Sequence, residues 1–170
     1  MKARLLATAL CFAFAASSCS GTSYRAGTYS LDGVRFILGD LPPEWKKVYG
    51  DRGLTWRRQD PKGTIITVNV SCKRVGDAPL EVLTNHLLFG LTERSYEERQ
   101  LVPYLGREAE RALVLAKLDG VPVKLSTMVL KRNRCVYDAF YAAAPEHFDA
   151  HRDEFEKMLA GLEIVEQRSD

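Results

Sequence analysis

The 170-residue sequence lacks the short motifs that mark the common catalytic sites. It contains no Gly-x-Ser-x-Gly turn, no phosphate-binding Gly-x-x-x-x-Gly-Lys loop, no Gly-x-Gly-x-x-Gly and no His-Glu-x-x-His. Long apolar runs are missing too: the run over residues 5–16 is shorter than the roughly 20 residues that span a bilayer. The sequence therefore offers no signature of a serine hydrolase, a nucleotide-binding enzyme, a zinc protease or a permanent transmembrane helix.

An excess of charge of one sign is also absent. The chain carries 24 Lys and Arg residues against 22 Asp and Glu residues. Two of the basic residues, Lys2 and Arg4, precede the apolar run, so the chain from residue 19 onward holds 22 residues of each sign. A neutral chain without a stripe of basic and aromatic residues gives no reason to expect nucleic acid as a partner.

What is present at the start is an export signal. Lys2 and Arg4, the apolar run and small residues up to Ser18 form the order typical of a signal peptide. The sequence Ala16-Ser17-Ser18-Cys19 resembles the lipobox of bacterial lipoproteins, although Ala16 stands where Leu is usual. The resemblance implies cleavage before Cys19 and acylation of its thiol, palmitate being an expected chain. Ordinary cleavage that leaves a soluble protein with a free thiol is the alternative. Ser20 favours the outer membrane over the inner one.

Four cysteines are present, and lipidation would leave two of them to pair. Cys11 leaves with the signal peptide and Cys19 is blocked as a thioether, so Cys72 and Cys135 remain for a disulfide in an oxidising compartment. Such a bond closes a loop of about 63 residues and stabilises the fold by about 4 kcal/mol. Separate buried thiols are the alternative, and a catalytic thiol paired with His86 has no local motif to support it.

The remaining length is typical of one domain. We expect a lipidated tether over residues 19–33, which are rich in Gly, Ser, Thr and Tyr, and a short disordered tail over residues 166–170. Between them, residues 34–165 form a single domain.

Residue patterns in this domain predict an antiparallel sheet with helices on its faces, an α+β fold. Strands are expected over 34–38, in a hairpin over 54–58 and 64–72, and in a meander over 108–118, 121–130 and 134–142. One helix begins near Pro79 with an apolar stripe of leucines, and a second begins between Pro145 and Phe148.

This succession resembles the PsbP-like fold. The resemblance rests on Phe36 in the first strand, Pro43 and Trp45 after it, the leucine-rich helix, the meander turning at Asp119-Gly120 and the terminal helix. The superfamily includes the extrinsic photosystem protein, the Mog-type Ran-binding proteins and bacterial lipoproteins of the DcrB kind. It implies an α/β/α sandwich and a non-catalytic, partner-binding role without a cofactor, and it supplies no common catalytic residue.

The first helix has a second apolar stripe that one sheet contact would not cover. Val82 and Phe89 lie almost opposite its leucines, and Trp45 is a further aromatic side chain in an irregular segment. Together they are our tentative surface for binding an envelope protein or a small hydrophobic ligand. The alternative is that loops over residues 41–49 or 102–105 cover the stripe.

Two histidines carry the competing enzymatic interpretation. His147 and His151 lie four residues apart on the predicted second helix, which lets two imidazoles reach one metal ion, and Glu154 could be a third ligand. We favour two boundary histidines over a metal site, because no remote fourth ligand is evident. The expectation is thus a membrane-anchored periplasmic accessory or binding lipoprotein. A metal-dependent hydrolase and a purely structural envelope protein are the alternatives.

Overall fold

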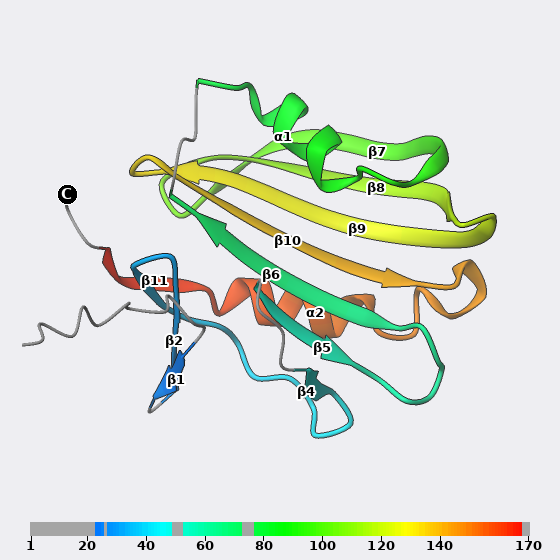
Figure 1. The fold of residues 1–170 in the computed structure, drawn as a ribbon, viewed down its shortest axis with the longest axis horizontal. Helices are drawn as coiled ribbons and strands as arrows, with labels where there is room; N and C mark the ends of the chain where they lie inside the picture. Colours follow the sequence, from blue (N-terminus) through cyan, green and yellow to red (C-terminus); the bar gives the residue numbers. More distant parts are fainter. Residues whose placement is uncertain (1–22, 26, 49–52, 73–76, 168–170) are drawn as a thin grey trace, which may run out of the picture.

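The computed structural model describes residues 23–25, 27–48, 53–72 and 77–167. These residues form two antiparallel sheets, two α-helices and one 3₁₀ turn (Figure 1). The strands are β1 (Ser23–Arg25), β2 (Thr28–Leu31), β3 (Val34–Ile37), β4 (Lys46–Val48), β5 (Leu54–Arg57), β6 (Ile65–Ser71), β7 (Thr92–Tyr104), β8 (Arg107–Leu118), β9 (Val121–Arg132), β10 (Cys135–Ala143) and β11 (Glu163–Gln167). The helices are α1 (Leu80–Leu87) and α2 (Arg152–Ala160), with the 3₁₀ turn η1 at Pro145–His147.

The larger sheet has seven strands in the order β4-β5-β6-β10-β9-β8-β7. Its predicted hairpin and meander are confirmed, and β10 pairs with both β6 and β9 at the centre. Two-residue turns with positive φ at both positions close the meander, at Leu105-Gly106, Asp119-Gly120 and Asn133-Arg134. These turns have the twist that antiparallel strands prefer, which explains why Asp119-Gly120 is a reliable sequence signal.

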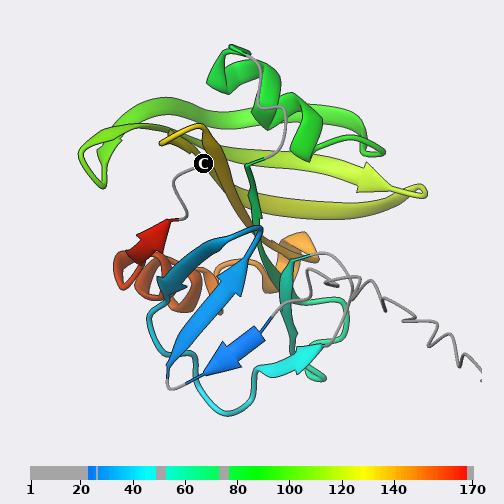
Figure 2. The same cartoon turned by 60° about the vertical axis from the view of Figure 1, so that its left-hand side comes forward.

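The smaller sheet, in the order β1-β2-β3-β11, lies with α2 on one face of the larger sheet (Figure 2). The main core fills the space between these layers, and Tyr137, Tyr141, Phe36, Phe148 and Phe155 are its largest fully buried side chains. The end of α2 approaches the segment after β3 so closely that a Cβ on Gly161 would lie 2.5 Å from the Cα of Gly39. Glycine is therefore required at this crossing.

The opposite face of the larger sheet is covered by α1, which packs on β8 and β9 (Figure 2). A second apolar cluster lies beneath it, with Leu88, Val114 and Leu125 among its buried members. Arg99 on β7 connects α1 to the sheet, since its guanidinium donates hydrogen bonds to Glu81 of α1 and to Glu110 of β8. The arrangement of layers confirms the predicted α+β fold with helices packed on its faces.

Three predicted boundaries need correction. The tether over residues 19–33 contains β1 and β2, so from Ser23 on this segment belongs to the smaller sheet. The tail at 166–170 overlaps β11, which ends at Gln167. The second helix begins at Arg152, because the proline at 145 starts a separate 3₁₀ turn. The signal peptide and Cys19 lie outside the described residues. Within the described ranges, no helix is long and apolar enough to cross a membrane.

Candidate functional site

Trp45 is buried beneath α2, so its expected place on an exposed binding surface is wrong. Only 5% of its surface is exposed. Its indole Nε1 donates a hydrogen bond to Glu154 Oε2 at 2.5 Å, and its ring meets Tyr141 and His151 edge to face at 6.4 and 6.3 Å. The hydrogen bond from the indole therefore attaches the segment after β3 to α2.

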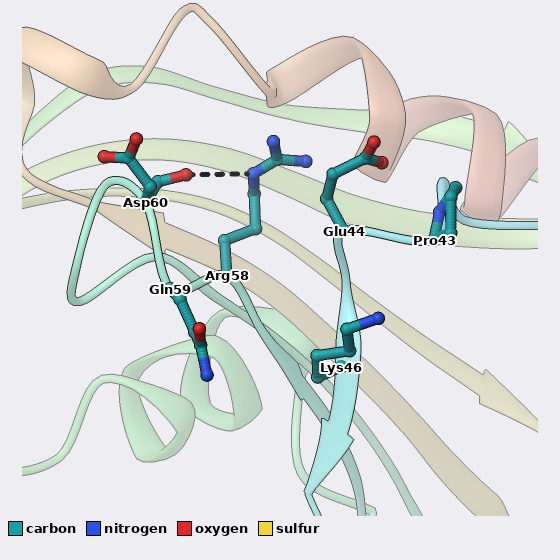
Figure 3. A pocket seen from close by; sticks show the side chains of 6 residues that line it. All are labelled: Pro43, Glu44, Lys46, Arg58, Gln59 and Asp60. Atoms are coloured by element: carbon teal, nitrogen blue, oxygen red, sulfur yellow. Dashed lines mark hydrogen bonds between the residues drawn. The ribbon is translucent and has the colours of Figure 1, made fainter.

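Arg58 closes this aromatic cluster from the solvent side. Its guanidinium lies 5.6 Å from the Trp45 ring, Nη1 lies 3.5 Å from Glu154 Oε2, and Nε donates to the carbonyl of Asp60. Beside it is an open pocket of about 550 Å³, where the carboxylates of Glu44 and Asp60 stand on either side of the guanidinium (Figure 3). Lys46 supplies a second cation. The charges of these lining side chains are balanced, and one of the cations is already paired.

A second hollow, of about 400 Å³, is also lined by Pro43, together with Pro42 and the residues before it. Most of its lining residues are aliphatic or aromatic, with Tyr29, Trp45 and Trp56 from three different segments of the chain, and about half of the surface that they present to the hollow is polar. Asp40 is the one ionisable group other than tyrosine among its lining residues. We call this hollow the tryptophan hollow, because both tryptophans of the sequence contribute to it. Aromatic and aliphatic side chains beside placed polar groups are typical of concave sites for small molecules.

The two histidines do not share a helix face, so the geometric premise of the metal interpretation is wrong. His147 ends η1 and is exposed, whereas His151 is the N-cap residue of α2. His151 Nδ1 lies 3.4 Å from Glu154 Oε1, without the geometry of a hydrogen bond. The Glu154 carboxylate already accepts a hydrogen bond from Trp45 and forms an ion pair with Arg58. Within the described ranges, no group of three or more His, Cys, Asp or Glu side chains is placed to hold a metal ion.

The predicted disulfide between Cys72 and Cys135 is present. Cys72 directly follows β6 and Cys135 begins β10, two strands that are neighbours in the larger sheet. The backbone N–H of Cys72 also donates to Asp32 Oδ2 at 2.6 Å, which connects the bridge to the turn between β2 and β3. The disulfide therefore links two neighbouring central strands of the larger sheet, near the contact of this sheet with the smaller sheet.

Val82 and Phe89, predicted to share a second apolar stripe of the first helix, are exposed, but only Val82 lies on α1, because the helix ends at Leu87 and Phe89 follows it in a turn. Val82 and Phe89 keep 44% and 90% of their surface accessible. The segments that could have covered them lie on the opposite side of the sheet: Trp45 docks on α2, and Tyr104 donates its hydroxyl to the carbonyl of Leu159. The alternative in which loops 41–49 or 102–105 cover the stripe is therefore wrong for the described residues.

Comparison with known proteins gives a fold and no closer relationship. No family model and no curated sequence matches the chain. Among solved structures, cyanobacterial PsbP (CyanoP) from Synechocystis is 10% identical, with a TM-score of 0.55 over 91% of this chain and 98% of its own. LpqN, involved in cell envelope biogenesis of Mycobacterium tuberculosis, is 12% identical, with a TM-score of 0.57 over 79% and 87%.

The domain has a PsbP-like fold. A third structure agrees, the protein of unknown function PA94 from Pseudomonas aeruginosa, at 15% identity and a TM-score of 0.51 over 88% of this chain and 99% of its own. Identities this low show the fold alone. The functional residues of the PsbP-like domain must therefore be sought in its own surface and in its buried polar groups.

One buried polar group of the PsbP-like domain has no signal in the sequence. Asp138 lies at the centre of β10, on the face of the larger sheet that carries α1, opposite Asn69 of β6. Its Oδ1 is fully buried, and no donor among the residues that the structure describes forms a hydrogen bond with it. Burial raises the pKa of this carboxyl to about 6, against a smaller lowering by the hydrogen bond from Asn69. Only the strand register, which follows from the fold, brings the two residues together.

Proposed function

We propose that this protein is a lipoprotein of the bacterial cell envelope that is held at the membrane by acyl chains on Cys19. Its PsbP-like domain faces the periplasm and works as a non-catalytic accessory module that binds an envelope protein or a small hydrophobic ligand. The likeness of its fold to LpqN, a protein of cell envelope biogenesis, supports the placement in the envelope. The residue Ser20 after the cysteine favours the outer membrane.

The tryptophan hollow is the observation that carries the binding role. It combines aromatic and aliphatic side chains with polar surface and with the acidic residue Asp40, and it opens where β2 and the segment after β3 meet β5. This place is near the start of the described chain. Ser23 of β1 is four residues beyond Cys19, so the extended linker reaches at most about 14 Å. A lipid on Cys19 would thus hold the smaller sheet close to the membrane surface.

Contacts at the Trp45 end favour binding over catalysis. Glu154 is the carboxylate that a hydrolytic mechanism would use, yet it accepts a hydrogen bond from Trp45 and forms an ion pair with Arg58. A carboxylate that is engaged by two side chains of the fold is not free to meet a substrate. Its role here is to fasten α2 to the segment that carries Trp45.

The anchor is tested by palmitate labelling and membrane fractionation of cells that express the full chain. The wild type should incorporate labelled palmitate and sediment with membranes, and Cys19→Ala should lose both properties. A matched control is the pair Cys72→Ala and Cys135→Ala, which should keep the label. A wild type without label would contradict the anchor.

Ligand binding is tested by intrinsic fluorescence, because both tryptophans line the hollow. Decanol, a small hydrophobic probe, should change the emission saturably in the wild type. Ile37→Phe adds bulk to the hollow lining and should abolish the response, whereas Leu101→Phe on the exposed edge strand β7 should not. If decanol leaves the wild-type emission unchanged, the hollow does not bind small apolar molecules and the protein-binding form of the proposal is favoured.

A further inference from the structure

Three arginines lie together at one end of the larger sheet. Arg107 follows the β7–β8 turn, Arg132 ends β9, and Arg134 lies in the β9–β10 turn. The two turns are side by side, because Arg132 Nη1 donates a hydrogen bond to the carbonyl of Leu105 at 2.9 Å. We call Arg107, Arg132 and Arg134 the arginine end.

Arg107 and Arg132 share the face of the larger sheet that carries α2 and the smaller sheet. Ala109 of β8 pairs with Leu130 of β9, and both belong to the main core on that face. The two arginines come two residues further along the same strands, so they lie opposite one another and point the same way. Arg107 and Arg134 are exposed, and Arg132 is half-buried.

The positive charges of the arginine end are not neutralised by ion pairs. Within the described ranges, none of its three guanidinium groups pairs with a carboxylate. Glu108 follows Arg107 in β8, so its side chain points to the other face of the sheet, which carries α1. Lys131 precedes Arg132 and points to that other face too, where it forms an ion pair with Asp77 at 3.4 Å. The arginines therefore keep their charge available for a ligand.

The opposite end of the larger sheet carries acidic residues instead. The β5–β6, β8–β9 and β10–α2 connections lie there, since neighbouring strands of this sheet run in opposite directions. Lys62 is the one exposed lysine or arginine in these connections. Four exposed carboxylates in them form no ion pair with any residue that the structure describes: Asp60, Asp119, Glu146 and Asp149. The charges of the domain are thus polarised along the strands.

The arginine end lies at the same end of the molecule as the strand that follows Cys19. In Figure 1 the β7–β8 turn, the β9–β10 turn and β1 lie toward the left, whereas the three acidic connections lie toward the right. The linker from Cys19 to Ser23 of β1 reaches at most about 14 Å. A lipid on Cys19 would therefore bring the arginine end toward the membrane surface and turn the acidic end away from it.

We propose that the arginine end is a second membrane contact, which binds the phosphate groups of anionic phospholipids. Guanidinium groups suit phosphate oxygens, because their parallel N–H donors match the spacing of those oxygens. Each basic side chain near an anionic surface strengthens the association about fivefold. The inference rests on the proposed anchor, which supplies the effective concentration that lets a contact of three side chains form. Two contacts instead of one fix the orientation of the domain on the membrane.

Hydrogen exchange of the lipidated full chain on vesicles tests the contact. The vesicles contain phosphatidylcholine alone or with about 30% phosphatidylglycerol, which is anionic. Mass spectrometry should show that amide exchange in the β7–β8 and β9–β10 turns is at least about fivefold slower on the anionic vesicles. The difference should vanish in about 1 M salt, where the Debye length is about 3 Å. The turn at Asp119-Gly120 should exchange equally fast on both kinds of vesicle.

The variant Arg107→Gln with Arg134→Gln should remove the slowing. Neither side chain forms a hydrogen bond or an ion pair within the described ranges, so the variant should unfold at the temperature of the wild type. Arg132 stays in place because it joins the two turns. Exchange on anionic vesicles should then lie within about twofold of the rate on phosphatidylcholine. Lysines at the same two positions should keep at least about half of the slowing. The control Lys62→Gln, which removes a cation at the acidic end, should change nothing.

The outcomes separate the arginine end from the anchor. If the wild type stays on phosphatidylcholine vesicles but exchanges equally fast on both kinds, the anchor holds and the arginine end is overturned. Slowing that persists in the double variant, or that inorganic phosphate produces without anionic lipid, would also overturn the membrane contact. If the wild type does not stay on phosphatidylcholine vesicles, the anchor fails, and sedimentation of the full chain with phosphatidylglycerol vesicles decides. Sedimentation of the wild type without the double variant supports the arginine end, and any other result overturns it.

Discussion

The indole of Trp45 and the carboxylate of Glu154 form a hydrogen bond of 2.5 Å between residues 109 positions apart in the chain. Both residues stand out in the sequence as functional candidates, one as an exposed aromatic and the other as a metal ligand. Their contact gives each a structural role, because it fastens the segment after β3 to α2. Arg58 adds a cation to the same carboxylate and covers the indole ring.

Removing the indole donor should therefore destabilise the domain measurably. We expect Trp45→Phe to lower the free energy of unfolding by about 2 kcal/mol, since it leaves a partly buried carboxylate with one partner fewer. Urea unfolding followed by circular dichroism measures the change. In a double-mutant cycle with Glu154→Met, which removes the acceptor, the two losses should be non-additive by at least about 0.5 kcal/mol. Strict additivity would show that the hydrogen bond contributes nothing to stability.

A larger effect is expected at Arg99, which binds Glu110 through Nη2 at 2.8 Å and Glu81 through Nη1 at 3.2 Å. Glu110 is only 5% exposed, so Arg99→Met leaves a buried charge without its partner. The cost should be about 3 kcal/mol, and amide exchange in α1 should accelerate because the helix loses its tie to β7.

Lys117→Met is the control for Arg99, because its ion pair with Glu93 is solvent-exposed and should cost less than about 1 kcal/mol. The double variant Arg99→Met and Glu110→Leu should regain part of the loss, since it removes the buried charge together with its partner. If the double variant is no more stable than Arg99→Met alone, the penalty arises from lost packing of the arginine rather than from the carboxylate.

The central strands could be predicted from sequence because their signals are local. β8 and β9 meet at Asp119-Gly120, and both residues of that turn adopt positive φ, which Asp tolerates and Gly favours. β7 gave no such signal: it is an edge strand exposed on both faces for most of its length, so its charged residues show no alternation of burial. Its charges, two register shifts and Pro103 also protect the edge from pairing with another chain.

The candidate sites were harder to predict, because they depend on contacts between distant segments. Burial of Trp45 follows from the crossing of two glycines, Gly39 and Gly161, which no periodicity reveals. The start of α2 was misplaced since Pro145 is a valid helix-start signal that here opens only a 3₁₀ turn. The exposure of Phe89 could be predicted in part from its place opposite the leucines in the sequence pattern, although α1 ends at Leu87 and Phe89 lies in the turn that follows.

Asp138 should make stability depend on pH. Its pKa is raised from 3.8 in the unfolded chain to about 6 in the fold by burial. The folded state therefore holds the proton more tightly. This group's contribution is most favourable below about pH 4, decreases as the pH rises to about 6, and is constant above that. Two pKa units correspond to about 3 kcal/mol of destabilisation at neutral pH.

Asp138→Asn removes the buried charge and keeps the shape. We expect the variant to be more stable than the wild type by about 2 kcal/mol at pH 8, with the difference shrinking toward pH 4. Urea midpoints between pH 4 and pH 8 measure it, and Asp149→Asn, an exposed carboxylate, should track the wild type throughout. A constant difference over this range would mean that Asp138 does not titrate in it.

The disulfide should act mainly through the unfolded chain. Cys72 and Cys135 flank strands that are already hydrogen-bonded neighbours, so the bond adds little to the folded state, whereas it closes a loop across a separation of 63 residues in the unfolded one. The chain-entropy model gives about 4 kcal/mol for such a loop. The pair Cys72→Ala and Cys135→Ala should lower the free energy of unfolding by this amount, measured in urea. Reductant should bring the wild type to within about 1 kcal/mol of that variant and leave the variant itself unchanged. A reduced wild type as stable as the oxidised one would place the stabilisation in the sheet contacts around the bridge, because those contacts would then persist in the absence of the bond.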